Sequence, residues 1–226
     1  MKAQNFDGDK KVPMKSLLAK YERKFIDSNI EKFPAWLEGY HLTLITIPLS
    51  IGLIVFGYLA SSNLNWLWLS SVVLFLQWFT DSFDGALGRH RDTGIPKWGF
   101  YMDHFLDFVF MSCVFLGYSF LFDGLNKVLM FFMVPAFGCL MVSSFLAFGA
   151  TGQFKITYLR TGPTEIRAVF ILLNCFIVIF GTGFLEKALI YIFIAFVSAM
   201  CVVVFRTQKY IWNIDMQNKA ARKDES

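Results

Sequence analysis

Four aspartates lie beside or within stretches of sequence that are apolar enough to enter a lipid bilayer. Asp81 and Asp84 follow one apolar run, and Asp103 and Asp107 lie in the next. A carboxylate held against hydrocarbon is unfavourable, so such a residue suggests a functional role. Because residues three or four apart share one face of a helix, each pair presents its carboxylates in one direction. We therefore expect the two pairs to converge around a cation.

Composition places the chain among proteins that cross the bilayer several times. Hydrophobic residues make up 56% of the 226 residues, phenylalanine alone contributes 27, and the mean hydropathy is +0.51. A helix needs roughly 20 apolar residues to cross a bilayer. The expected spans are residues 42–60, 64–80, 99–122, 126–149, 166–184 and 187–205. These patterns predict an all-α integral membrane protein with six transmembrane helices.

The remaining sequence predicts a three-part organisation. Residues 1–41 form a cytoplasmic segment, residues 42–206 a six-helix transmembrane domain, and residues 207–226 a cytoplasmic tail. The tail is polar from Lys209 to Ser226, and we expect this part to fray. Within the first part, residues 14–33 carry apolar side chains at helical spacing until Pro34 ends the pattern. We expect an amphipathic helix in the membrane interface, with a soluble helix that lacks a specific packing surface as the alternative.

Basic residues are distributed unevenly between the two sides of the expected bundle. Of the 21 lysines and arginines, only Lys127 and Lys187 fall on the outer side. The positive-inside rule therefore places both termini and the 81–98 loop in the cytoplasm. The aspartates should face the cytoplasm of a multi-pass protein, in a bacterial inner membrane or, as the alternative, an ER-type membrane.

The aspartates form a motif with fixed offsets, D-x2-D-G-x2-G-R-x9-G-x3-D-x3-D. Carboxylate oxygens suit Mg²⁺ or Mn²⁺, and the motif lacks the His/Cys set that is typical of zinc. Two divalent ions would neutralise four carboxylates and bind a pyrophosphate. Gly85 and Gly88 allow the backbone to approach a nucleotide, and Arg89 suits a bidentate contact with phosphate. The expected metal ligands are Asp81, Asp84, Asp103 and Asp107.

This motif resembles the signature of the CDP-alcohol phosphotransferases, also called CDP-alcohol phosphatidyltransferases, which reads D-x2-D-G-x2-A-R-x8-G-x3-D-x3-D. Two departures are visible: Gly88 replaces the usual alanine, and one extra residue separates Arg89 from Gly99. The six spans and the N-terminal helix also resemble this family of membrane enzymes. The matching positions are Asp81, Asp84, Gly85, Arg89, Gly99, Asp103 and Asp107.

The resemblance implies a specific reaction and specific partners. Members of the family cleave the pyrophosphate of a CDP-linked alcohol, release CMP and move the phospho-alcohol onto a second alcohol. By this likeness the four aspartates hold a metal pair, Asp107 is also a candidate base, and Gly85, Gly88 and Arg89 border the nucleotide. The implied partners are the CDP-alcohol donor, an alcohol or lipid acceptor, membrane lipids and, as a homodimer, a second copy of the chain. Nucleic acid is not expected.

Two further features bear on the substrate. His104 follows Asp103, and Thr164 and Glu165 precede the fifth span. This arrangement is similar to the branch of the family that uses CDP-choline or CDP-ethanolamine with diacylglycerol. There, His104 and Glu165 would act together as the base, because a carboxylate orients an imidazole. The alternatives are an interfacial histidine without a role and a glutamate that the helix dipole favours at a helix start.

Two other functions stay open. The second branch of the family joins CDP-diacylglycerol to a small polar alcohol such as glycerol phosphate, inositol phosphate or serine. Lys155, Arg160 and Arg167 would suit an anionic acceptor, or they are simply positive-inside charges. A cation transporter or channel is the alternative of another class. It would spread acidic residues along a path through the membrane, whereas these aspartates cluster at one edge.

Overall fold

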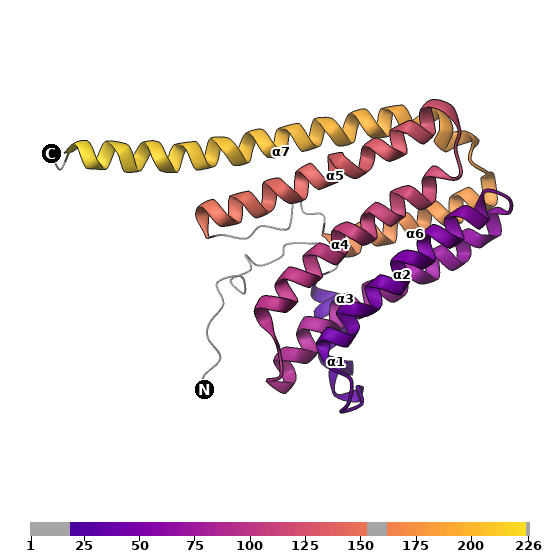
Figure 1. Cartoon of the computed structure of the whole chain (residues 1–226), viewed down its shortest axis with the longest axis horizontal. Helices are drawn as coiled ribbons and strands as arrows, with labels where there is room; N and C mark the ends of the chain where they lie inside the picture. Colours follow the sequence, from indigo (N-terminus) through magenta and orange to yellow (C-terminus); the bar gives the residue numbers. More distant parts are fainter. Residues whose placement is uncertain (1–18, 153–161, 225–226) are drawn as a thin grey trace.

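The computed structural model describes residues 19–152 and 162–224, and all regular structure in these two ranges is helical. Two short 3-10 turns, η2 (Ile30–Lys32) and η3 (Leu64–Trp66), precede α2 and α3 (Figure 1). The α-helices in the described ranges are α1 (Ala19–Asn29), α2 (Gly39–Ala60), α3 (Leu67–Arg91), α4 (Pro96–Ser119), α5 (Gly124–Thr151), α6 (Pro163–Phe180) and α7 (Gly183–Asp224).

The described helices α2, α4, α5, α6 and α7 are long and apolar enough to cross a membrane. α3 packs along α2 in the same bundle, but Gln77, Thr80, Asp81 and Asp84 make its second half more polar. The predicted all-α membrane fold is thus confirmed, and five of the expected spans correspond to helices of suitable length and composition. A crossing by α3 stays a prediction.

A tight turn brings the two aspartate pairs to the same end of the bundle. α3 ends at Arg91, and the next residue, Asp92, has a left-handed φ of 55°. The Thr93 N–H donates to the Gly88 carbonyl at 3.2 Å. α4 then begins at Pro96, ahead of the expected start at Gly99, because the missing N–H and fixed φ of proline suit a first helical turn. The carboxyl half of α3 and the amino half of α4 are therefore neighbours.

α2 forms the centre of the packing, since it contacts both α3 and α4. Its crossing with α4 is very close: a Cβ added to Gly57 would lie 2.5 Å from the Cα of Gly117. Small residues permit such approaches where lipid offers helices little hydrophobic driving force. Around this crossing, the core buries Leu74 of α3, Phe110 of α4 and Ile177 of α6 almost completely.

A buried chain of hydrogen bonds joins three helices. The Tyr118 hydroxyl of α4 donates to the Asn174 Oδ1 of α6 at 2.6 Å. The Asn174 side-chain amide in turn donates to the Ser71 hydroxyl of α3 at 3.0 Å. Because an unpaired polar group would be costly in such surroundings, these bonds favour one packing of α3, α4 and α6 over alternatives.

The expected N-terminal helix is confirmed over the described residues Ala19–Lys32, as α1 followed by η2, while residues 14–18 lie outside the described ranges. α1 packs against α3, where Phe25 stacks on Trp78 with ring centroids 5.9 Å apart. At the end of α3, Arg91 donates to carbonyls of the connection to α2, including that of Phe33 at 2.8 Å. The position of α1 in a membrane interface stays a prediction.

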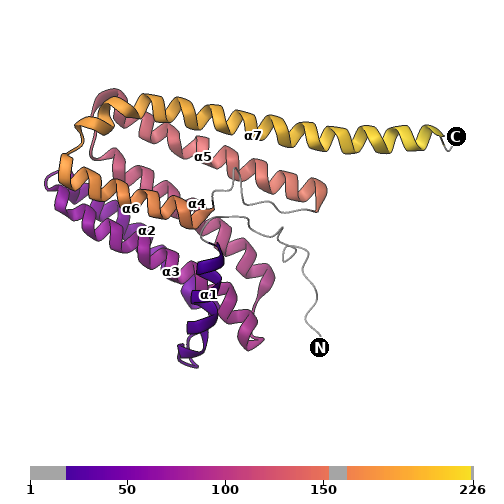
Figure 2. The ribbon, with the colours of Figure 1, turned by 180° about the vertical axis from the view of Figure 1, so that it is seen from behind.

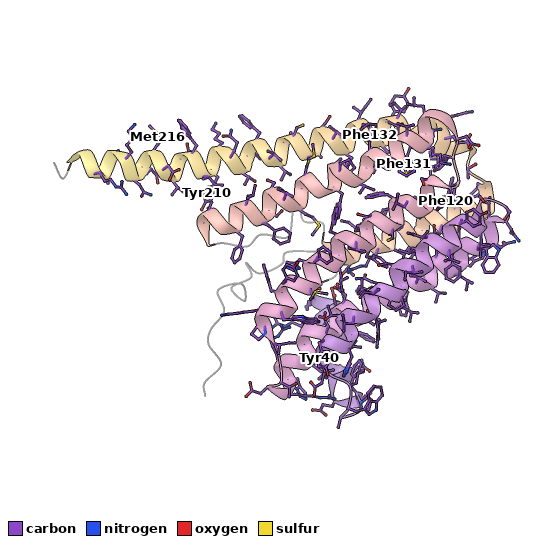
Figure 3. The ribbon with its side chains drawn as sticks, in the orientation of Figure 1. Tyr40, Phe120, Phe131, Phe132, Tyr210 and Met216 are labelled. Atoms are coloured by element: carbon purple, nitrogen blue, oxygen red, sulfur yellow. The ribbon has the colours of Figure 1, made fainter. Side chains whose placement is uncertain are left out.

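The expected fraying of the tail is wrong for the described residues, because α7 continues as one helix to Asp224. No glycine or proline interrupts residues 184–224, and the last turns are rich in helix-favouring Lys, Ala, Arg and Gln. α7 runs beside α5 and then extends beyond the other helices (Figures 1 and 2). Large apolar side chains such as Phe131 and Phe132 of α5 are exposed (Figure 3), as expected of a surface that faces lipid.

Candidate active site

The four aspartates gather at one end of the bundle around an arginine from a third helix. Arg167 of α6 places Nη1 2.9 Å from the Asp81 Oδ2 of α3 and Nη2 3.2 Å from the Asp107 Oδ1 of α4. Electrostatic repulsion links Asp84 with Asp81 and Asp103, and Asp107 with the same two carboxylates. The expected convergence of the two pairs is therefore present, while the role of these residues as metal ligands stays a prediction.

Asp84 is fixed by hydrogen bonds from two directions. The Thr43 hydroxyl of α2 donates to Asp84 Oδ2 at 2.7 Å, and the Gly85 backbone N–H donates to Asp84 Oδ1. α2 can come so near because its first residue is Gly39. A Cβ at that position would lie 3.2 Å from the carbonyl carbon of Asp84 and closer still to its oxygen. Gly39 thus sets the distance between α2 and the aspartate turn of α3.

The two motif glycines and the motif arginine have different surroundings. Gly88 is buried, and a Cβ on it would lie 3.1 Å from the Cα of Gly94, so the turn itself requires a small residue there. Gly85 is exposed, and the Arg89 guanidinium lies beside it, with Nη1 3.1 Å from an added Cβ. Packing explains Gly88 without a nucleotide, and contact of Gly85, Gly88 and Arg89 with a nucleotide stays a prediction.

His104 lies beside the two carboxylates of α4. Its Nδ1 lies 3.1 Å from Asp103 Oδ2, and ligand atoms of Asp103, His104 and Asp107 all fall within 4.8 Å of one another. The carboxylate of Glu165 accepts the Gly162 backbone N–H at 2.9 Å and so caps the start of α6. His104 therefore has a carboxylate partner on its own helix, and its pairing with Glu165 stays a prediction.

Glu22 of α1 ties the N-terminal helix to both sides of the site. It accepts hydrogen bonds from the Ser82 hydroxyl at 2.8 Å and from the Thr164 hydroxyl at 2.9 Å. Ser82 follows Asp81, and Thr164 precedes Glu165. α1 therefore holds α3 and α6 together directly beside the aspartates. Sequence reasoning missed Glu22, because nothing in its local pattern distinguishes it from the other charged residues of α1.

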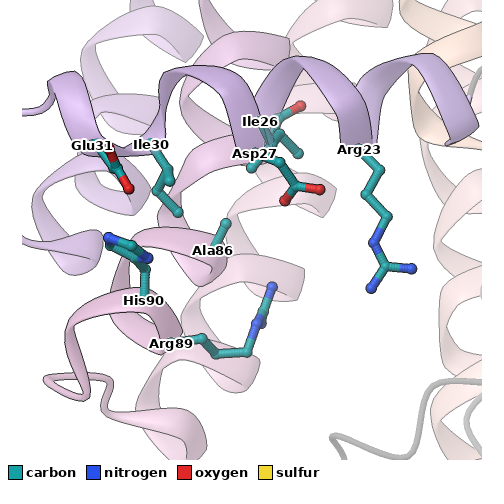
Figure 4. A pocket seen from close by; sticks show the side chains of 9 residues that line it. Arg23, Ile26, Asp27, Ile30, Glu31, Ala86, Arg89 and His90 are labelled. Atoms are coloured by element: carbon teal, nitrogen blue, oxygen red, sulfur yellow. The ribbon is translucent and has the colours of Figure 1, made fainter.

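A groove of about 380 Å³ separates α1 from the last turns of α3 (Figure 4). Its charged lining comes from Arg23, Asp27 and Glu31 on one side and from Arg89 and His90 on the other. The positions of the α3 residues on the helix place this groove on a different face from the aspartates. It is thus adjacent to the carboxylate cluster without being part of it.

Arg167 is the site residue that sequence analysis considered only as an acceptor-binding or positive-inside charge. It is 5% exposed and lies in a mostly apolar helix. An ionisable residue inside a span generally faces a functional interior, and that signal could have singled out Arg167. Lys155 and Arg160, considered with it, lie outside the described residues.

The residues present fit divalent cations. Four carboxylates and an imidazole supply oxygen and nitrogen donors, and the oxygen majority suits Mg²⁺ or Mn²⁺. Arg167 already occupies the place of a cation between Asp81 and Asp107, so this arrangement accommodates positive charge. One guanidinium cannot balance four carboxylates, and the remaining negative charge would attract further cations.

Comparison with known proteins identifies the family of the chain. No curated protein matches the sequence significantly. The sequence model of the CDP-alcohol phosphatidyltransferases, however, matches residues 40–209, which is most of the chain. The matched stretch contains all four aspartates, His104, Glu165 and Arg167. The chain therefore belongs to the CDP-alcohol phosphatidyltransferase family.

Proposed function

We propose that the chain is a divalent-metal-dependent enzyme of phospholipid synthesis, which transfers a phospho-alcohol group from a CDP-alcohol to an acceptor alcohol and releases CMP. Family membership makes it a transferase of substituted phosphate groups. The observation that carries the metal dependence is the gathering of four carboxylates from α3 and α4 at one end of the bundle.

Each residue then has a defined task. Asp81, Asp84, Asp103 and Asp107 would hold two Mg²⁺ or Mn²⁺ ions. Such ions, when bound, neutralise a pyrophosphate and polarise the phosphorus that is attacked. Thr43 and the Gly85 N–H orient Asp84, and Gly39 keeps α2 near enough for the Thr43 bond.

The acceptor hydroxyl must lose a proton during the transfer. His104 and Asp107 lie in the same cluster, so either can take that proton without a long movement. Asp103 contacts His104 Nδ1 and thereby orients the imidazole. We assign the base to His104 assisted by Glu165, with Asp107 as the alternative.

The proposed substrates are a CDP-amino-alcohol and a lipid hydroxyl. Support comes from the Asp103–His104 and Thr164–Glu165 neighbours, which are similar to that branch of the family. The alternative is CDP-diacylglycerol with a small polar alcohol.

The proposed topology has six spans. α3 is one of them, although its polar residues lower its hydropathy. α3 is 25 residues long and packs beside α2, so it is long enough to span a bilayer. The basic residues then place both termini and the aspartates on the cytoplasmic side, where α1 lies in the interface. A transporter is disfavoured, because the carboxylates cluster at one end of the bundle instead of following a path through it.

A donor panel tests the proposed function. Membranes that contain the protein are incubated with Mg²⁺ and labelled CDP-ethanolamine or CDP-choline plus diacylglycerol. Parallel samples receive CDP-diacylglycerol plus glycerol phosphate, inositol phosphate or serine, and the lipid products are separated. Membranes with Asp81→Asn serve as the control. Lipid formed from a CDP-amino-alcohol supports the proposal. Lipid formed only from CDP-diacylglycerol would contradict the branch, and no lipid from any donor would contradict the function.

A double-substitution cycle tests the base. Glu165→Gln removes the charge but retains an oxygen that can accept the Gly162 N–H, so the α6 cap survives. His104→Ala removes the imidazole. If the two residues act as one unit, either change alone and both together should cost similar factors, about 10² to 10⁴ in CMP release. Losses that multiply would separate Glu165 from His104 and favour Asp107 as the base.

A further inference from the structure

Arg167 forms a buried bridge between two helices. Its guanidinium contacts Asp81 of α3 through Nη1 at 2.9 Å and Asp107 of α4 through Nη2 at 3.2 Å, so two nitrogens serve two different carboxylates. The Arg167 side chain is 6% exposed, whereas those of Asp81 and Asp107 are 21% and 26% exposed. The planar fork of arginine offers two separate nitrogens for such a two-way contact, whereas the lysine ammonium is a single point of charge.

The same two carboxylates belong to the proposed metal ligands. Arg167 contacts Asp81 Oδ2 and Asp107 Oδ1. Asp81 and Asp107 would therefore have to serve both the guanidinium and any divalent ion that they hold. The positively charged guanidinium also repels an incoming cation. Metal binding and the Arg167 bridge therefore oppose each other.

We propose that Arg167 is an internal counter-cation, which holds Asp81 and Asp107 in place in the metal-free protein and competes with the divalent metal for them. This inference rests on the proposed metal dependence and adds a regulatory element to that site. It assigns to Arg167 the role of a positioning residue that sets the metal concentration at which the site fills.

Linkage gives the sign of each effect. Energetic coupling between two sites is reciprocal, so a bridge that metal weakens must itself weaken metal binding. Removing Arg167 also leaves two partly buried carboxylates without their cation, which destabilises the metal-free protein. Arg167→Gln should therefore bind metal more tightly and be less stable in its absence.

Three variants separate the charge of Arg167 from its geometry. Arg167→Gln removes the charge, and Arg167→Lys keeps it but cannot reach both carboxylates with a planar fork. Arg23→Gln is the matched control, because Arg23 is exposed on α1 in the neighbouring groove and its loss changes the net charge equally. If Arg167→Gln cannot be purified folded, Arg167→Lys decides the question alone.

The readouts are metal affinity and stability, without turnover. Free Mn²⁺ is measured by electron paramagnetic resonance during titration of the purified protein in detergent. We expect the Mn²⁺ Kd of Arg167→Gln to fall about 5- to 150-fold, the usual range of coupling between sites, with Arg167→Lys intermediate and Arg23→Gln unchanged. Thermal unfolding in EDTA and in Mn²⁺ should show a larger metal-induced rise in Tm for Arg167→Gln than for the wild type.

Each outcome is decisive. Unchanged or weaker Mn²⁺ binding by both Arg167 variants, beside normal binding by the wild type, would overturn the counter-cation role and leave the metal site standing. An equal fall in the Mn²⁺ Kd of Arg23→Gln would show that net charge acts at long range, without local competition by Arg167. That result would also overturn the counter-cation role. Absence of Mn²⁺ binding in the wild type and all variants would overturn the metal dependence and the inference together.

Discussion

Gly39 provides a sharp test of how α2 positions the site. In Gly39→Ala, the new Cβ would lie 3.2 Å from the Asp84 carbonyl carbon and closer still to its oxygen. Non-bonded atoms prefer about 3.5 Å or more, so α2 and α3 must separate by roughly 1 Å. The Thr43–Asp84 bond of 2.7 Å lies one helical turn away and would lengthen accordingly. A misplacement of about 1 Å near a reacting centre can cost about 10²-fold in rate.

Stability should change less than activity in this variant. Overpacking costs about 1–3 kcal/mol, whereas replacing glycine by alanine in a helix returns up to about 1 kcal/mol. Both effects act at Gly39, so we expect a folded protein with a modest fall in Tm. The loss of rate then reports the displacement of Asp84 and not unfolding.

The assay is the initial rate of CMP release by purified protein at saturating metal, with Tm measured on the same samples. Gly52→Ala is the matched control, because it lies on the same helix and an added Cβ would meet only side chains, at 3.6 Å. We expect about 10²-fold loss for Gly39→Ala and less than about twofold for Gly52→Ala. Equal rates in the two variants would refute the idea that the close approach of α2 fixes Asp84.

Two further predictions follow from the bundle. Tyr118→Phe leaves the Asn174 side-chain oxygen without its partner at 2.6 Å. Thermal unfolding in detergent should show a loss of about 1–3 kcal/mol in stability, with little change in the rate of CMP release. Unchanged stability would contradict the buried network. In a protein without its native cysteines, a cysteine at Ser61, just after α2, should react with an impermeant reagent outside intact cells. A cysteine at Asp92, just after α3, should not react, because the basic residues place the 81–98 loop in the cytoplasm. Labelling at Asp92 would reverse the topology.

Local spacing was sufficient to predict much of this molecule. Asp81 with Asp84 and Asp103 with Asp107 are related by helical periodicity, a property of a few consecutive residues, and the structure brings the pairs together. The all-α membrane fold likewise follows from long apolar runs. The crossing expected for residues 64–80 stays a prediction, because polar residues of α3 such as Gln77, which faces the interior, lower the hydropathy of that helix.

Contacts between segments that lie far apart in the chain could not be predicted from the sequence. Arg167 lies 60 residues after Asp107 and looks, in isolation, like any positive charge at a membrane interface. Glu22 meets Thr164 across 142 residues, and the need for Gly39 depends on where the backbone of Asp84 lies. Each depends on how helices assemble, and one sequence carries no direct record of that assembly. The fraying expected for the tail from Lys209 was wrong as far as Asp224. These residues are polar, but most of them favour helix, so polarity alone does not predict fraying.

In the proposed function, the four carboxylates hold the divalent metal that is required for transfer from a CDP-alcohol. The most direct measurement is CMP release across a Mn²⁺ titration, starting in EDTA, for the wild type and for Asp84→Asn with the donor that the panel identifies. Asparagine keeps the shape, and its single oxygen can still accept from Thr43, whereas its amide group cannot accept the Gly85 N–H. The variant should therefore fold, with a modest fall in Tm. We predict no CMP from the wild type in EDTA, full activity with Mn²⁺, and none from Asp84→Asn at any concentration. Wild-type turnover in EDTA, or near-normal turnover by Asp84→Asn, would contradict the proposal that these carboxylates hold an essential metal.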